Sequence, residues 1–226
     1  MCPHTVHAVI AVKTLESAKS RLAGVLAREQ RSRLVLAMLA DTVRAAGAVP
    51  GVASITVVTP DAAVADTVRA LGAQVHPEPA GGGADGLNTA LADAAAALRA
   101  RHGEIGLLAL QADLPALRPA ELSAVLAAAP AHSRALVADH AGTGTAALLA
   151  PPGVALRPRF GRDSAHRHRD DGAHELHGHW PGLRRDIDTP EDLAAVLALG
   201  PGRDTAALLD EPGWPRHVRE TVTQVC

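Results

Sequence analysis

The chain has 226 residues, a formal net charge of -2 and 47% hydrophobic residues, which is enough for one α/β domain with a packed core. Aromatic residues make up only 1% of it, which argues against recognition of single-stranded nucleic acid by base stacking. The sequence carries no basic excess, signal-peptide pattern or apolar run of membrane-spanning length, so we expect a cytoplasmic protein that binds neither nucleic acid nor membrane.

Short apolar runs alternate with segments of helical periodicity over the first 130 residues. Buried strands are expected at residues 7–12, 54–59, 73–77 and 105–110. Helices are expected at residues 31–47, 60–72, 87–103 and 118–129. Because strands that alternate with helices are typical of βαβ units, the sequence predicts an α/β fold with a mainly parallel sheet flanked by helices.

The pattern changes after residue 130, where predicted strands follow each other more directly. Strands are expected at 134–139 and 145–151, a polar helix-compatible segment at 163–176, extended chain at 183–188 and a helix at 190–200. Two successive strands without a helix between them indicate an antiparallel element, and therefore a mixed sheet. We expect one domain over residues 1–200, followed by a Pro- and Gly-interrupted C-terminal tail over residues 201–226.

Chemically active side chains follow several of the predicted strands. Residues 1–50 also carry seven Lys and Arg against three Asp and Glu, which would suit a small polyanionic ligand. In open α/β sheets, ligands bind outside the carboxyl ends of the strands, so these side chains are expected to converge on one edge. They are Lys13, Lys19 and Arg21 after the first strand, Gly81, Gly82 and Gly83 after the third, Asp113 after the fourth, and Asp186 and Asp188 in the last extended segment.

This combination suits a nucleoside triphosphate held together with Mg²⁺. Carboxylates are the hard oxygen ligands that Mg²⁺ prefers, and cations neutralise charge on a transferring phosphoryl group. Glycines let backbone N–H groups approach phosphates closely. The glycine loop lacks the Gly-Lys-Ser/Thr ending of a P-loop, and no glycine fingerprint follows the first strand. A P-loop kinase and a dinucleotide-binding dehydrogenase are therefore both disfavoured.

Each of these features also has a purely structural interpretation. The glycine loop could be a flexible connection, the lysine segment a solvated helix face, and Asp113 the cap of a turn. Thr189 and Pro190 form a good helix start, but Asp186 and Asp188 lie outside that cap. In extended chain these two carboxylates share one face and repel each other unless a cation lies between them.

A histidine-rich segment follows, with His166, His168, His174, His177 and His179. Such a cluster could bind a transition metal, although its spacings match no standard zinc signature. Histidine-rich polar segments are more often solvated, and the sequence leaves both interpretations open.

Six motifs taken together, in chain order, resemble the CofC/FbiD family. They are "VKTLESAKSRL", "GGGADGLNTAL", "QADLPAL", "GTGTAALL", "FGRDSAHRH" and "LRRDIDTPEDL", and they span about residues 7–197. The family consists of guanylyltransferases in the biosynthesis of coenzyme F-420. The resemblance implies a single-domain GT-A-like nucleotidyltransferase fold, related to MobA- and IspD-like enzymes. It also implies transfer of GMP from GTP to a small phosphorylated three-carbon acid, with release of pyrophosphate. The resemblance implies that the acid is phosphoenolpyruvate, as in actinobacterial members of the family, or 2-phospho-L-lactate, as assigned to archaeal members. The bias toward Ala, Arg and Gly is similar to that of actinobacterial proteins, so the resemblance favours phosphoenolpyruvate.

The resemblance further implies roles for individual residues. Asp113, Asp186 and Asp188 match the aspartates that bind the metal cofactor, Mg²⁺. Catalytic roles fall to Lys13, Lys19 and Asp113. The triphosphate would be held by Lys13, Lys19 and Arg21, and guanine and ribose would be bordered by Gly81, Gly82, Gly83, Leu87 and Asn88. The acceptor acid would be held by Thr145, Gly161 and Ser164.

The assembly and the alternatives stay open at this point. We expect a monomer or homodimer, with hand-over of the unstable product to the next enzyme of the pathway. Another MobA- or IspD-like nucleotidyltransferase and a non-catalytic nucleotide-binding module are the alternative functions.

Overall fold

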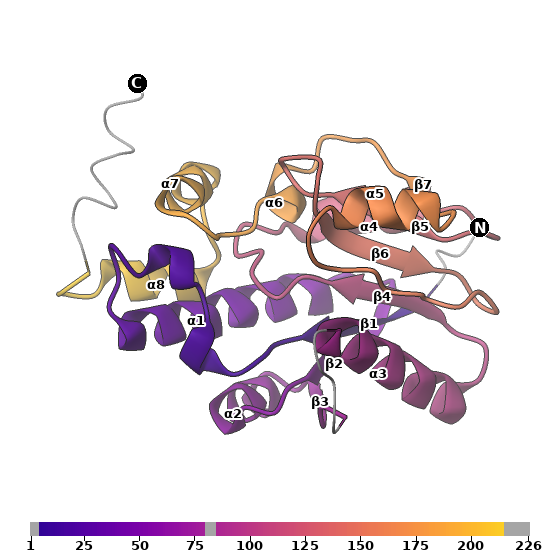
Figure 1. The fold of residues 1–226 in the computed structure, drawn as a ribbon, viewed down its shortest axis with the longest axis horizontal. Helices are drawn as coiled ribbons and strands as arrows, with labels where there is room; N and C mark the ends of the chain where they lie inside the picture. The colour runs from indigo at the N-terminus through magenta and orange to yellow at the C-terminus, as the bar shows by residue number, and fades with distance from the viewer. Residues whose placement is uncertain (1–4, 80–84, 215–226) are drawn as a thin grey trace.

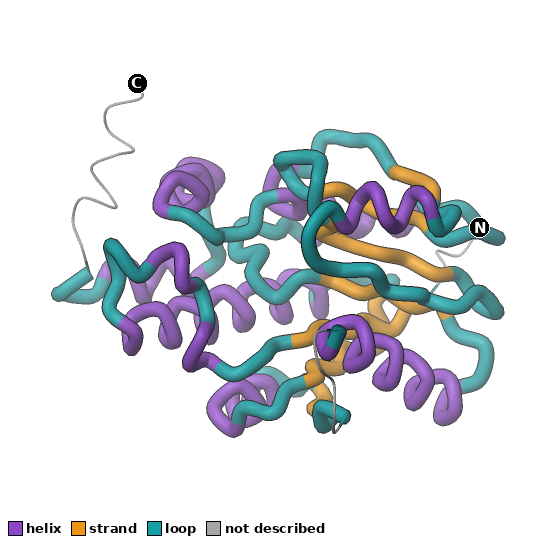
Figure 2. Tube along the Cα trace, in the orientation of Figure 1, coloured by secondary structure: helices purple, strands orange, loops and turns teal. Residues whose placement is uncertain are grey.

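One mixed sheet of seven strands runs through residues 5–79 and 85–214, the part of the chain that the computed structural model describes (Figures 1 and 2). Its order is β3-β2-β1-β4-β6-β5-β7. The strands are β1 (Val6–Ala11), β2 (Val52–Val58), β3 (Gln74–His76), β4 (Gly106–Leu110), β5 (Ala135–Ala138), β6 (Thr145–Ala150) and β7 (His174–Glu175). Only β6 runs antiparallel to its neighbours in this described part, β4 and β5. The predicted α/β fold with a mixed, mostly parallel sheet is therefore confirmed.

Helices cover both faces of the sheet and bury two hydrophobic clusters. One face packs against α3 (Gly86–His102) and α5 (Ser164–Asp170), which lie in front of the strands in Figure 1. The second hydrophobic cluster joins the other face of the sheet to six helices of the described part of the chain. They are α1 (Arg28–Gly47), α2 (Ala62–Ala70), α4 (Pro119–Ala128), α6 (Pro181–Arg184), α7 (Pro190–Leu199) and α8 (Arg203–Asp210). Strand β4 alternates between the two clusters, with Leu107 facing α3 and Leu108 facing the opposite side.

The segment 183–188 differs from the extended chain that the sequence predicts, because Leu183 and Arg184 close the short helix α6. Pro181 occupies its first turn, where a missing N–H costs nothing. The carboxylate of Glu121 accepts hydrogen bonds from the N–H groups of Gly182 and Leu183, each at 3.0 Å. A side chain distant in sequence thus satisfies the free donors of this turn and makes it helical.

The polar segment 163–176 is helical only in its first half. Helix α5 ends at Asp170, and Gly172 then adopts a left-handed backbone with φ of 84°. Glycine reaches this conformation without steric cost, so it ends the helix and turns the chain into the short strand β7.

Strand ends with different directions meet at one edge of the sheet. Because β6 is antiparallel, its first residues lie level with the carboxyl end of β4, where Leu110 pairs with Ala147. The N–H of Gln111 donates to the carbonyl of Ala146 at 3.1 Å and continues this pairing beyond the strand. The loop that carries Asp113 and the turn before Thr145 therefore share this edge.

Candidate functional site

A cavity of about 460 Å³ lies at this edge, within the range typical of small-molecule sites. Its walls come from segments that are distant in the sequence: the loop after β1, the start of α3, the loop after β4, the turn before β6 and the start of α5. Seven residues singled out from the sequence line it. They are Arg21, Leu87, Asp113, Gly161, Ser164, Asp186 and Asp188.

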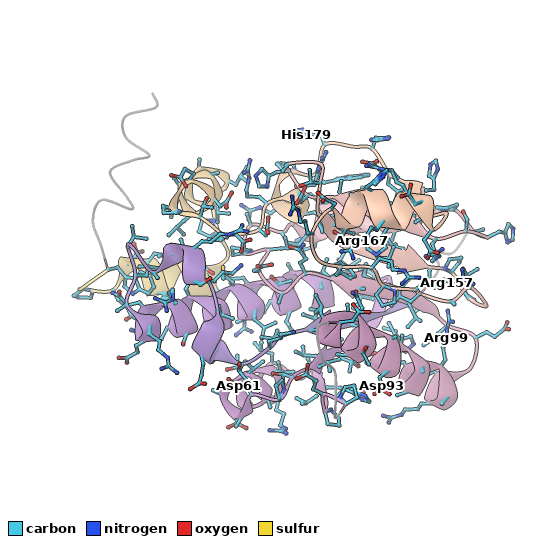
Figure 3. All side chains as sticks on the ribbon, in the orientation of Figure 1. Asp61, Asp93, Arg99, Arg157, Arg167 and His179 are labelled. Carbon is cyan, nitrogen blue, oxygen red and sulfur yellow. The ribbon has the colours of Figure 1, made fainter. Side chains whose placement is uncertain are left out.

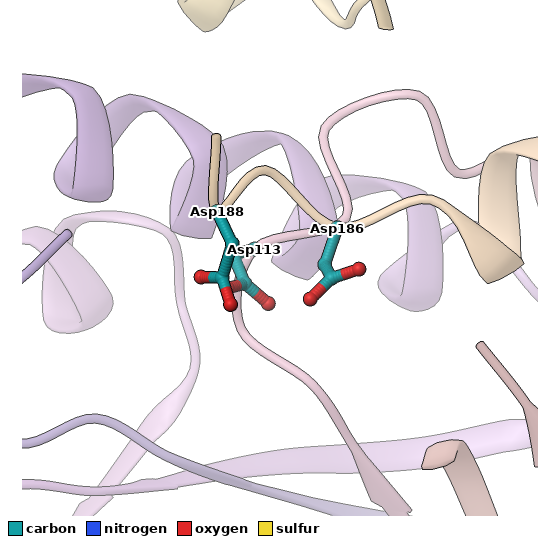
Figure 4. A group of neighbouring side chains, drawn as sticks. All are labelled: Asp113, Asp186 and Asp188. Carbon is teal, nitrogen blue, oxygen red and sulfur yellow. The ribbon is translucent and has the colours of Figure 1, made fainter. Parts of the chain in front are cut away.

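Three carboxylates gather at one end of the cavity. One oxygen from each of Asp113, Asp186 and Asp188 lies within 4.8 Å of the others. Figure 4 shows the three side chains facing a common space, with Asp113 arriving from the loop after β4. Within residues 5–79 and 85–214, this is the single group of three or more such side chains that could hold a metal ion.

A helix cap holds the backbone of Asp188 in place. Asp192, in the first turn of α7, accepts hydrogen bonds from the N–H groups of Asp188 at 3.1 Å and Thr189 at 2.9 Å. In return, the hydroxyl of Thr189 accepts from the N–H of Asp192 at 3.2 Å. This reciprocal capping box fixes where helix α7 begins, and so fixes the segment that presents Asp188.

Lys19 supplies the positive charge nearest to the carboxylates. Its Nζ donates to Asp113 and, at 2.9 Å, to Oδ1 of Asp188. Arg21 reaches the other oxygen of Asp188 at 3.3 Å. Burial opposes the charged form of Lys19, but Asp113 and Asp188 outweigh it and raise the pKa of the ammonium above its usual value. Lys19 is therefore a permanent cation beside Asp113 and Asp188, although it does not itself line the cavity.

Asp186 is the least compensated of the three carboxylates. Burial, and then the negative charges of Asp113 and Asp188, raise the pKa of Asp186 to about 7. The site thus concentrates more negative charge than Lys19 offsets at this position. A cluster of hard oxygen ligands with uncompensated negative charge fits a divalent cation.

The loop that carries Lys19 is held by a helix N-cap. Asp61, labelled at the start of α2 in Figure 3, accepts from the N–H groups of Ala63 and Val64 through Oδ1. Its other oxygen, Oδ2, accepts from the N–H of Leu15 at 3.0 Å. Lys19 itself adopts a left-handed backbone with φ of 52°, which is uncommon for a residue with a side chain. Lys13, earlier in the loop, is exposed and does not line the cavity.

Of the three residues predicted to hold the acceptor acid, two line the cavity and one lies behind its wall. Gly161 and Ser164 line the cavity, whereas Thr145 is fully buried behind the wall. The Oγ1 atom of Thr145 lies 3.1 Å from Oγ of Ser164 and 2.9 Å from Nδ1 of His168. Thr145 therefore supports Ser164 rather than presenting its own side chain.

Asn88 also lies behind the wall, unlike its neighbour Leu87. Its Oδ1 accepts from the N–H of Phe160 at 2.7 Å, and its Nδ2 donates to the carbonyl of Phe160 at 3.1 Å. This double hydrogen bond fixes the backbone beside Gly161. Gly81, Gly82 and Gly83 lie outside the described residues.

Several residues that line the cavity were not foreseen from the sequence. They are Ala11, Leu91, Leu110, Gln111, Ala112, Asp139, Thr143, Gly144, Phe160, Arg162 and Asp163. Asp139 is the last residue of the predicted strand at 134–139 and directly follows the observed strand β5, so the rule that led to Asp113 could also have found it. Its carboxylate accepts from the N–H groups of Thr143 at 3.1 Å and Gly144 at 2.9 Å, which shapes the turn before β6.

The five histidines do not form a metal site. His168 is buried between Thr145 and the backbone of Arg159, while the ring of His166 lies 3.3 Å from Asp170 on the surface of α5. The possibility of a transition-metal centre that the sequence left open therefore finds no support in the described part of the chain.

Among residues 5–79 and 85–214, no helix is both long and apolar enough to cross a bilayer.

Comparison with known proteins agrees with the fold and the motifs. Residues 6–222 match the family described as "Guanylyl transferase CofC like", so the match extends beyond the motifs into the segment after residue 200. The chain is 63% identical to a phosphoenolpyruvate guanylyltransferase from Nocardia farcinica over 226 residues, covering 100% of both chains. It is 49% identical to one from Rhodococcus opacus over 224 residues, covering 93% of each.

A solved structure shares the architecture at low sequence identity. A protein from Desulfovibrio desulfuricans, assigned as a nucleotide-diphospho-sugar transferase, has a TM-score of 0.67 at 14% identity and covers 98% of both chains. At this identity the likeness shows that the two chains share a fold. Sequence motifs, fold and family match together lead to one assignment: the chain belongs to the CofC-like family of guanylyltransferases.

Proposed function

We propose that this guanylyltransferase transfers GMP from GTP to phosphoenolpyruvate and releases pyrophosphate, as a step in the biosynthesis of coenzyme F-420. The observation that carries the choice of acceptor is the identity of 63%, over the whole chain, to a protein named phosphoenolpyruvate guanylyltransferase. The cavity supports the proposal because it combines cationic and carboxylate side chains with a hydroxyl and a glycine backbone.

The two substrates would occupy different ends of the cavity. Lys19 and Arg21, next to the carboxylates, would bind the triphosphate together with Lys13, which lies earlier in the same loop. The hydroxyl of Ser164 and the backbone near Gly161 would bind the carboxylate of the acceptor through hydrogen bonds to a charged group. Leu87, in the apolar wall, would border the nucleoside, with Asn88 fixing the neighbouring backbone.

Asp113, Asp186 and Asp188 would hold Mg²⁺. When bound, Mg²⁺ would screen the repulsion between the phosphates that must approach each other. Two like charges about 4 Å apart repel by about 4 kcal/mol at an effective dielectric constant of about 20. Lys19 and Arg21 lower the same barrier, because they place two positive charges beside the carboxylates.

The reaction needs no general base. The acceptor phosphate is already ionised at neutral pH, so one of its oxygens can form a bond to the α-phosphorus of GTP directly. The bond from the α-phosphorus to the oxygen that bridges to the β-phosphorus breaks in the same displacement. The electron pair of that bond leaves with pyrophosphate, whose charge Lys19 and Arg21 stabilise.

Pyrophosphate release tests the proposal. The protein is incubated with Mg²⁺ and with GTP, CTP or ATP, and with phosphoenolpyruvate, 2-phospho-L-lactate or no acceptor. We expect release with GTP and phosphoenolpyruvate together, and none without an acceptor. Release with 2-phospho-L-lactate but not with phosphoenolpyruvate would show the acceptor to be wrong, and no release with either acid would contradict the reaction.

Two aspartate variants, one at the proposed metal site and one at a control position, test the role of Asp188. Asp188→Ala should lower kcat at least about a hundredfold, because a lost charge contact in the transition state costs about 3 kcal/mol. Asp66→Ala, at an exposed aspartate on α2 that pairs with Arg69, should leave kcat unchanged. Near-normal turnover of Asp188→Ala would exclude Asp188 from the metal site.

A further inference from the structure

A buried histidine connects three segments of the cavity wall. The ring of His168, on α5, is fully buried and lies edge-on to Phe160, with the ring centres 5.2 Å apart. Nδ1 lies 2.9 Å from the hydroxyl of Thr145 on β6, and Nε2 accepts a hydrogen bond from the N–H of Arg159 at 2.8 Å. One imidazole therefore joins the start of β6, the segment 159–161 and helix α5.

These contacts define the tautomer of the ring. Nε2 accepts from a backbone N–H, which always donates, so Nε2 carries no proton. Burial, followed by the nearby positive charges of Arg134 and Arg167, lowers the pKa of His168 to about 4, so the ring is neutral at neutral pH. A neutral imidazole has one N–H, which must then be at Nδ1, where it faces Oγ1 of Thr145 at 2.9 Å and also the backbone of Ser164.

The tautomer in turn determines the direction in which the hydroxyl groups of Thr145 and Ser164 donate their hydrogen bonds. Oγ1 of Thr145 accepts from His168, and within the described residues its other hydrogen-bond partner is Oγ of Ser164, 3.1 Å away. Either hydroxyl can donate across this contact, but Thr145 is fully buried and already accepts from His168, so its own proton is satisfied only when it points to Ser164. The proton of Ser164 is then free to point away from Thr145, into the cavity that Ser164 lines.

We propose that His168 is a positioning residue that makes Ser164 a hydrogen-bond donor toward an anionic oxygen of the acceptor. The chain of donors runs from Nδ1–H of His168 to the Thr145 hydroxyl, then to the Ser164 hydroxyl, and ends in the cavity. The inference rests on the proposed function, which places the acceptor at Ser164. It goes further in assigning the donor direction of Ser164 to a residue that touches no substrate.

Two substitutions of His168 separate its two contacts. In His168→Gln, the amide oxygen can reach the Nε2 position and accept from Arg159, but no donor to Thr145 remains. In His168→Asn, the amide N–H can replace Nδ1–H, while the contact to Arg159 is lost. We expect His168→Gln to raise KM for phosphoenolpyruvate about tenfold, the size of one hydrogen bond to a charged group, with KM for GTP unchanged. His168→Asn should lower the melting temperature and keep KM for the acid within about twofold of wild type.

Thr145→Val tests the relay itself. It should raise KM for the acid about tenfold, and the double variant with His168→Gln should raise it no further, because both changes break one chain. Thr56→Val is the matched control, since Thr56 is another buried strand threonine and its hydroxyl has no partner among the described residues. Its KM values should equal those of wild type.

The outcomes distinguish this inference from the proposed function. If Ser164→Ala and Thr145→Val raise KM for the acid but His168→Gln does not, His168 has no positioning role, and the acceptor site stands. If Ser164→Ala also leaves this KM unchanged, the acceptor does not bind at Ser164 and both proposals are wrong.

The tautomer can be measured even if a histidine variant fails to fold. Nitrogen NMR of the wild-type imidazole at neutral pH should show a protonated Nδ1 and an unprotonated Nε2 for His168. A proton on Nε2, or on both nitrogens, would overturn the donor direction.

Discussion

At the scale of single residues, Lys19 has two partners whose mutual repulsion it relieves. Its ammonium bonds to Asp113 and Asp188, which come from different loops. These carboxylates would repel each other without a cation between them. Lys19 therefore contributes to stability as well as to the charge of the cavity, and its contribution should depend on whether a metal ion is bound.

Lys19→Gln should lower the free energy of unfolding by about 2 kcal/mol in EDTA, less than for a fully buried pair because Asp188 is half-exposed. The loss should shrink with excess Mg²⁺, since the ion then relieves the same repulsion. Urea unfolding under both conditions measures this difference. Lys13→Gln, at an exposed lysine, serves as the stability control, and an equal loss for Lys19→Gln in EDTA and in Mg²⁺ would contradict the shared site.

His168 should make stability depend on pH. Burial and the charges of Arg134 and Arg167, only partly offset by Asp171, lower the pKa of His168 from 6.5 to about 4. Between these values the unfolded chain takes up a proton that the native ring does not. The free energy of unfolding should therefore fall by up to about 3 kcal/mol as pH decreases from 6.5 toward 4. His168→Gln should show a smaller decrease in urea titrations over this range, and an identical slope would contradict the prediction.

At the scale of elements, Asp61 couples the stability of α2 to the position of the lysine loop. One carboxylate oxygen caps the helix and the other holds the N–H of Leu15. The two functions use different atoms of one side chain, so they can be separated by substitution.

Asp61→Ala should lower the free energy of unfolding by about 1 kcal/mol, because the N-cap is lost, and should also raise KM for GTP. Asp61→Asn can keep the cap through its amide oxygen but offers an N–H toward Leu15, so stability should be retained. Its KM for GTP should still rise about fivefold, the size of one lost hydrogen bond. Unchanged KM values in both variants would show that the loop does not depend on this contact.

At the scale of the whole molecule, the segment after residue 200 packs onto α1. The carboxylate of Asp41 accepts from the N–H groups of Asp204 at 3.0 Å and Thr205 at 2.8 Å, at the start of α8. Gly202 permits this approach, since a Cβ there would lie 2.4 Å from the Asp41 carboxylate. Leu208 and Leu209 are buried in the same core cluster as α1.

A chain that ends at residue 200 should lose about 5 kcal/mol of its free energy of unfolding, because Leu208, Leu209 and Trp214 no longer bury their side chains. The buried carboxylate of Asp41 would also lose its partners. Urea unfolding of this chain, compared with one that ends at residue 214, measures the contribution. Equal stability of the two chains would support the domain boundary at residue 200 that the sequence predicts.

The carboxylate site was predictable because two simple rules act at the same edge of the sheet. Asp113 follows an apolar strand, and the sequence predicts Asp186 and Asp188 on one face of a segment that precedes a recognisable helix cap. The rule that ligands lie at the carboxyl ends of parallel strands then brings the three together. Their mutual distances show that the three carboxylates converge, while their role as metal ligands stays a proposal.

The positions of Thr145, Asn88 and His168 were not predictable in the same way. All three belong to motifs that the sequence singled out, yet their side chains turn away from the cavity and hold its wall from behind. Helix α6 likewise depends on Glu121, which lies about sixty residues earlier in the chain. Such contacts have no local pattern in the sequence.

The amino-acid sequence by itself determined the alternation of strands and helices, the mixed sheet and the residues that follow each strand, because periodicity and turn residues act over a few neighbouring positions. Only the tertiary structure decided which of those residues face the cavity and which support it. Side-chain direction depends on packing between elements far apart in the chain, and a buried polar group must point to whichever partner that packing provides.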